Sequence, residues 1–126
     1  MTKSELKIPR NLKHKPVIFE KVSDDSDAKF FSIGKAQWDN NDFSIKVFRY
    51  VNNRWSPQSE EIPLGRFLKM AEFLIECIDG NFEGKKIQDG DSFEENLKDS
   101  LHNFRTQNFL VFKNICEILQ KWQREE

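Results

Sequence analysis

The chain has 126 residues, of which 37% are hydrophobic and 33% are charged, and its formal net charge is −1. This length suits one domain with some additions, and the apolar content is too high for a protein that is disordered throughout. The sequence shows neither an apolar run long enough to span a membrane nor a signal peptide. Cys77 and Cys116 lie in apolar helical patterns, which predicts small buried thiols in a reducing compartment.

The N-terminal residues 1–16 are polar and basic and contain Pro9 and Pro16, which predicts a flexible arm. Residues 1–21 hold six basic and two acidic residues, a local net charge of +4. The rest of the chain is acidic overall, so the basic character is concentrated in this arm. The arm is either a solvated tail or a segment that tracks phosphate groups.

The middle of the chain predicts three or four antiparallel strands separated by turns rich in Asp, Asn and Ser. The predicted strands cover 17–22, 29–38 and 43–51, and an extended stretch follows over 55–64. Gly34 lies inside the second strand, where a glycine usually marks a bulge or a close approach of another backbone.

Helical periodicity begins after this sheet. Its apolar stripe predicts an amphipathic helix that ends at Gly80, and the stripe consists of Phe67, Leu68, Ala71, Leu74, Ile75 and Ile78. Ser92 and Glu95 predict a capping box that opens a further helical segment. This segment is either one long helix or a pair with a joint near 106–108, and its apolar stripe must pack on the domain or on a partner chain.

The long strand 43–51 has two different faces, because side chains alternate along a strand. One face is largely aliphatic and contains Phe43, Ile45, Val47, Arg49 and Val51. The other contains Ser44, Lys46, Phe48 and Tyr50. We expect a helix to cover the aliphatic face and the aromatic face to stay open, where rings and cations would suit single-stranded nucleic acid. Alternatively, Phe48 and Tyr50 fill a second core or a dimer contact.

A series of short motifs resembles the positive cofactor 4 family of transcriptional coactivators. The matching positions are Ile33-Gly34-Lys35, Asp42-Phe43, Trp55 twelve residues after Phe43, Pro57, and Ile62 with Leu64 before the helix. The resemblance covers roughly residues 30–78. The chain departs from the family pattern at Gln37, Ser44 and Glu60–Glu61, where the family usually carries basic residues.

The resemblance implies a curved four-stranded sheet with a helix, in a homodimer whose sheets form channels for single-stranded DNA. By the same resemblance Lys35 contacts phosphate, Phe43 and Trp55 stack on bases, and Lys46 occupies a basic position. Trp38, Phe48 and Arg54 are further candidates for the nucleic-acid-binding site.

No catalytic or metal-binding pattern emerges. Residues 79–84 resemble the start of a calcium loop, but Gly90 stands where the bidentate Glu belongs. His14 and His102 have no metal-ligand spacing to a cysteine. We therefore expect no enzymatic activity, no metal and no cofactor.

The sequence thus predicts an α+β fold with an arm (1–16), a sheet-plus-helix DNA-binding core (17–80) and a C-terminal helical extension (81–126). The expected function is that of a homodimeric single-stranded-DNA-binding protein in replication, recombination or transcription, with weaker duplex binding. The alternative is a module that docks a replication or transcription protein, such as a polymerase component, through the open sheet face and the C-terminal helices. Either one is expected inside a cell: in the cytoplasm of a bacterium or virus-infected host, or in a eukaryotic nucleus.

Overall fold

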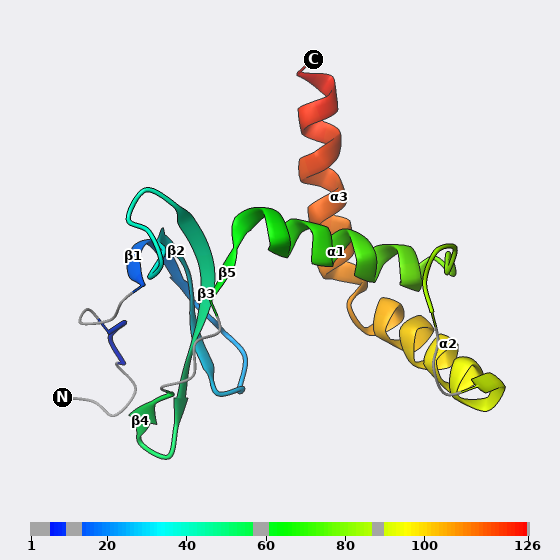
Figure 1. Ribbon diagram of the computed structural model, residues 1–126, viewed down its shortest axis with the longest axis horizontal. Helices are drawn as coiled ribbons and strands as arrows, with labels where there is room; N and C mark the ends of the chain where they lie inside the picture. The colour runs from blue at the N-terminus through cyan, green and yellow to red at the C-terminus, as the bar shows by residue number, and fades with distance from the viewer. Residues whose placement is uncertain (1–5, 10–13, 57–60, 87–89, 126) are drawn as a thin grey trace. The chain divides into compact units, whose positions relative to one another are not determined.

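The computed structural model describes residues 6–9, 14–56, 61–86 and 90–125, with only the backbone over 90–95 (Figure 1). It forms two compact units, Met1–Met70 and Ala71–Glu126. The boundary between these units lies inside the first helix, Leu64–Ile78. Among the described helices, none has the length and apolarity that a membrane span requires.

The first unit is built on an open antiparallel sheet. Its strands are β1 (Lys15–Lys21), β2 (Ala28–Lys35), β3 (Phe43–Val51), β4 (Arg54–Trp55) and β5 (Glu61–Pro63). The strand order is β1-β2-β3-β4, and β5 also pairs with β3. Together with three following helices, this confirms the α+β class. Asn52 and Asn53 both have positive φ angles, 53° and 63°, as a tight β3–β4 hairpin turn requires.

Gly34 marks both features that a glycine in a strand predicts. The β1–β2 register shifts between Pro16 and Ile18, opposite this part of β2. A Cβ atom at Gly34 would lie 2.1 Å from the Lys15 carbonyl oxygen and 2.9 Å from Nε2 of His14. Only a residue without a side chain allows β1 to approach β2 this closely.

The buried face of the sheet is the one that the sequence analysis expected to be open. Phe30 and Phe48 are 6% and 3% exposed, and Ser32 and Ser44 are buried with them. The ring of Trp55 covers Phe48 from one side at a centroid distance of 6.2 Å, and the ring of His14 lies 5.9 Å from Phe48. His14 and the β4 hairpin therefore cover this face, which corrects the expectation of an open face and agrees with the alternative in which Phe48 fills a second core.

The last residues of the predicted flexible arm, His14 to Pro16, are ordered. Residues 1–5 and 10–13 lie outside the described part of the chain. His14 is only 2% exposed, and Lys15 and Pro16 already belong to β1. The end of the predicted arm is therefore an ordered part of the sheet.

The helices are α1 (Leu64–Ile78), α2 (Gly90–Gln107) and α3 (Phe109–Arg124). Gly80 closes α1 as predicted: its φ angle is 83°, its N–H donates to Cys77, and the Asn81 N–H donates to Glu76. The predicted joint is confirmed at Asn108. The α2 helix begins two residues before Ser92, and the side chains of the predicted capping box lie outside the described ones.

The apolar stripes of the helices are largely uncovered. No residue of α1 or α3 is buried, and Leu68, Phe109 and Leu110 are among the most exposed apolar side chains. Cys116 is exposed and Cys77 is half-buried, which corrects the prediction of two buried thiols. Rings of Phe104 and Phe112 meet at 6.2 Å across the α2–α3 joint.

Replacing Gly34 with alanine should destabilise the first unit. The new methyl group would meet backbone rather than a movable side chain, so we expect a loss of about 1–3 kcal/mol in the free energy of unfolding. Gly65→Ala is the matched control, because a Cβ there meets nothing within 4 Å. Urea denaturation that gave the two variants equal stability would contradict the close approach.

Candidate nucleic-acid interface

Two lysines and an exposed aromatic ring lie side by side at one end of the sheet. Lys15 pairs directly with Lys35, and Lys35 pairs directly with Phe43. Directly opposed residues of antiparallel strands project from the same face. Both lysines are exposed, and the Phe43 side chain is 48% exposed. We call these three residues the cationic row.

The two lysines of the cationic row lack ion-pair partners within the described part of the chain. Like charges directly opposed on a sheet destabilise it. The free protein therefore carries a local repulsion that a bound anion would relieve.

Trp38 lies at the same end of the sheet, in the connection between Lys35 and Phe43. Its indole is 47% exposed, and its Nε1–H donates to Oδ2 of Asp42 at 3.1 Å. The Ala36 N–H donates to the Asp42 carbonyl at 3.0 Å and closes the turn. A second exposed aromatic ring is thus held close in sequence to the cationic row.

The remaining predicted site residues lie elsewhere. Phe48 is buried, so its ring has no free face for a base, and Lys46 Nζ lies over that ring at 5.2 Å. Trp55 is half-buried and packs edge-on against Tyr50 and Phe48. Arg54 is exposed on β4.

Phe43 and Trp55 therefore do not form one stacking site within a single chain. Trp55 pairs with Tyr50, seven residues along β3 from Phe43, which corresponds to about 23 Å along an extended strand. Tyr50 and Phe43 also project from opposite faces, because their positions differ by an odd number of residues.

A buried hydrogen-bond network lies on the covered face of the sheet. The ring of His14 contacts Ser32 Oγ through Nε2 at 3.0 Å, and contacts Ser44 Oγ and Glu61 Oε1 through Nδ1 at 2.8 Å and 3.1 Å. The Ser44 hydroxyl donates to Glu61 at 2.6 Å. We call these four residues the His14 network.

The hydrogen-bond pattern assigns the protons of the His14 network. Because Ser44 donates its only hydroxyl proton to Glu61, Nδ1 of His14 must be the donor toward both groups. Nε2 then accepts from Ser32 when the ring is neutral. The sequence analysis missed this network, because His14 fell in the predicted arm and two serines in a strand carry no distinctive signal.

The pKa of the Glu61 carboxyl is lowered by the His14 network. Burial alone raises the pKa, but hydrogen bonds from Ser44, from the Gln37 backbone N–H and from His14 together outweigh it. The result is a pKa below the ordinary value of 4.5. The ionised form of Glu61 is therefore favoured in the folded protein.

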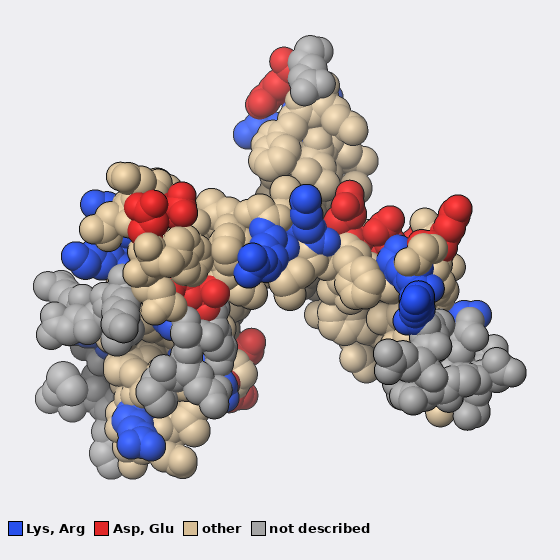
Figure 2. Space-filling view, in the orientation of Figure 1, with Lys and Arg blue, Asp and Glu red and all other residues tan. Residues whose placement is uncertain are grey.

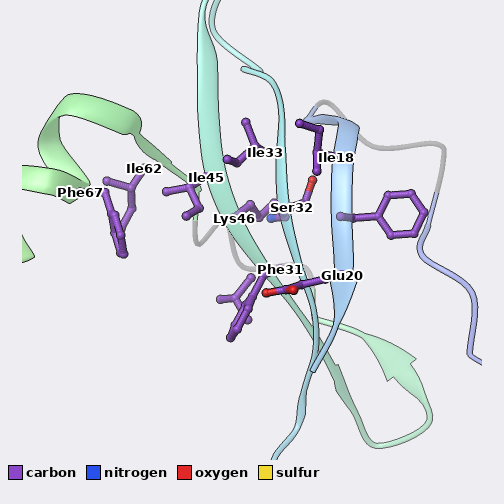
Figure 3. Close-up of a pocket in the computed structure, with 11 residues that line it drawn as sticks. Ile18, Glu20, Phe31, Ser32, Ile33, Ile45, Lys46, Ile62 and Phe67 are labelled. Carbon is purple, nitrogen blue, oxygen red and sulfur yellow. The ribbon is translucent and has the colours of Figure 1, made fainter. Parts of the chain in front are cut away.

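The open face of the sheet carries an apolar hollow of about 400 Å³ beside the cationic row (Figure 3). Figure 3 shows isoleucines in succession across the sheet, with Phe67 at one side. These are Ile18, Ile33, Ile45 and Ile62, which are paired across the sheet. Phe31, Val47 and Glu20 extend the lining. The aliphatic face is therefore the open face, contrary to prediction.

Charged side chains are mixed on the molecular surface. On the face shown in Figure 2, basic and acidic groups of the described residues are interspersed, with uncharged areas between them. On this face, neither sign of charge dominates among the described residues.

Comparison with known proteins identifies the family of this chain. A family of unknown function, DUF6530, matches residues 6–88, and the chain belongs to this family. No curated protein and no solved structure matches the chain. The matched span includes the whole sheet, the cationic row and the His14 network.

Glu61→Gln should reduce stability most strongly at neutral pH. A carboxyl with a lowered pKa stabilises the fold above its ordinary pKa, and this contribution is lost as the pH falls through the folded-state value. We expect a loss of about 1–3 kcal/mol at pH 7 that shrinks between about pH 5 and pH 3. The measurement is urea denaturation across this range, with Glu72→Gln as the control from an exposed position outside the hollow. A difference between wild type and Glu61→Gln that stayed constant with pH would contradict the role of the ionised carboxylate.

Proposed function

We propose that this member of the DUF6530 family binds single-stranded DNA through the cationic row and acts in replication, recombination or transcription. The observation that carries the proposal is the direct pairing of Lys15 with Lys35 beside the exposed ring of Phe43. The resemblance at Ile33-Gly34-Lys35 and Asp42-Phe43 supports the same assignment.

The electrostatics of the cationic row suit a phosphate. Two ammonium groups that repel each other in the free protein would both attract one phosphate placed between them. Each lysine that neutralises a phosphate releases condensed counterions, so the affinity should fall steeply as the salt concentration rises. This electrostatic contribution does not depend on the base sequence, so we expect only a weak sequence preference.

The exposed rings supply the contact that selects unpaired bases. A base stacked on an aromatic side chain contributes about 1–3 kcal/mol, and every base offers a flat face for this. Phe43 and Trp38 are each about half exposed and lie at the same sheet end as the lysines. Bases inside a duplex are already stacked, so single strands should bind more tightly than duplexes.

The proposal narrows the set of residues predicted from the sequence. It retains Lys35, Trp38 and Phe43 and adds Lys15. Phe48 is excluded, because its ring is enclosed by His14 and Trp55. Lys46, Arg54 and Trp55 stand apart from the row and are not assigned to it.

We further propose that the apolar hollow is covered by a second copy of the chain. A twofold contact places the same patch on both copies, so a patch that is almost entirely apolar complements itself. The hollow lies directly beside the cationic row, because Ile33 and Lys35 are two residues apart in β2 and project from the same face. The row would then lie at the rim of the dimer contact. Docking of a replication or transcription protein on this hollow is the competing assignment.

DNA binding is tested by fluorescence anisotropy with a labelled single strand of about 20 bases and its duplex. We expect tighter binding of the single strand, with Lys35→Gln lowering the slope of log K against log salt by about 0.7. Phe43→Ala should lose about 1–3 kcal/mol of binding energy with an unchanged slope.

The matched controls are Lys21→Gln, which removes an exposed lysine from the other face of β1, and Phe109→Ala, which removes an exposed ring of α3. Both should bind like the wild type. Absence of single-strand binding at low salt, or equal effects of site and control variants, would refute the cationic row as a DNA site.

The dimer is tested by light scattering coupled to gel filtration. We expect twice the chain mass of 15.0 kDa for the wild type. Ile33→Glu should give a monomer, because it places a charge in the hollow, whereas Val17→Glu alters an exposed position outside the lining and should stay dimeric. A monomeric wild type would reject the second copy and favour a different protein as the occupant.

A further inference from the structure

We propose that His14 is a positioning residue that holds Lys15 opposite Lys35 and thereby completes the cationic row. His14 directly precedes Lys15 in the chain. The effect of His14 on DNA binding rests on the proposed function, whereas the effect of His14 on the position of β1 does not.

This end of β1 is poorly held by its own backbone. Pro16 has no N–H to donate to β2, and the register shift between Pro16 and Ile18 interrupts the ladder. The repulsion between Lys15 and Lys35 adds a force that separates the two strands. An additional attachment is therefore required for Lys15 to remain in place.

The ring of His14 supplies that attachment. It is hydrogen-bonded to Ser32 of β2, Ser44 of β3 and Glu61 of β5, so one side chain ties the start of β1 to three other strands. The missing side chain at Gly34 leaves the space in which the ring and the Lys15 carbonyl fit. The ring is almost completely buried, and its bonds are shielded from competing water.

The His14 network has the connectivity of a hydrolase triad, with a serine, a histidine and a carboxylate in series. A nucleophile must meet its substrate, however, and both Ser32 and His14 are 2% exposed. The ring of Phe48 also packs beside His14. We therefore assign the His14 network to holding β1 against the sheet and not to catalysis.

Ser44 and Glu61 stand at positions where the chain departs from the coactivator pattern. Both are members of the network that holds His14. Ser44 and Glu61 replace basic residues of the coactivator pattern. Through their hydrogen bonds to His14, they hold a different cation, Lys15, on the opposite face of the sheet.

The test compares the salt slope of single-strand binding for His14→Ala, Lys15→Gln and the double variant. We expect each single variant to lower the slope by about 0.7, and the double variant to lower it no further, because both remove the same contact. His14→Asn keeps a donor near the Nδ1 position and should recover part of the slope. Phe30→Leu weakens the buried face without touching the network and should leave the slope unchanged.

Hydrogen exchange in the absence of DNA gives an independent readout. The amides of Lys15, Val17 and Ile18 should exchange faster in His14→Ala, and in the milder Ser32→Ala, than in Phe30→Leu. Unchanged exchange at these amides, or a salt slope that His14→Ala does not alter while Lys15→Gln does, would overturn the positioning role. If His14→Ala loses protection at these amides but the wild type binds no DNA, the proposed function is refuted, while the role of His14 in holding β1 is supported.

Discussion

The hydrogen bonds between His14 and Ser32, Ser44 and Glu61 determine which face of the sheet is closed. They hold the ring of His14 over β2 and β3, where it packs beside Phe48. Every polar group in this network has a partner, which is what makes its burial tolerable. Once this face is closed, the aliphatic face is left open. The cationic row then lies on the open face, at the end of the sheet where His14 is attached.

The open face consequently has two adjacent regions of different chemistry. Lys15, Lys35 and Phe43 form a small polar-aromatic end, and four isoleucines form an apolar centre. The first suits a phosphate and a base, whereas the second suits another protein surface. Their adjacency is the physical reason for linking DNA binding with dimer formation. It also explains how a chain with a net charge of −1 could bind DNA, because a pair of opposed lysines creates a local field that the total charge does not show.

Features that depend on neighbouring residues in the chain could be predicted from the sequence. Strand β3 begins and ends at the predicted residues, Gly80 closes α1, and the joint at Asn108 lies within the expected range. Gly34 was identified from its place in a strand. The covered face could not be predicted in the same way, because alternation defines two faces without saying which one is buried. That choice depends on a contact between His14 and Ser44, 30 positions apart. Lys15 was missed for the same reason, since it was assigned to the arm, and Phe48 was placed on an open surface.

The proposed site for a single strand of DNA is the Lys15–Lys35–Phe43 end of the open face. The most direct measurement is a nuclear magnetic resonance titration of the isotope-labelled protein with a short oligonucleotide, followed at the backbone amides and the indole N–H groups. We expect chemical-shift changes concentrated at Lys15, Lys35, Phe43 and the Trp38 indole, with the Trp55 indole unchanged. Shifts centred on Arg54 and Trp55, or no shifts at low salt, would contradict the proposed site.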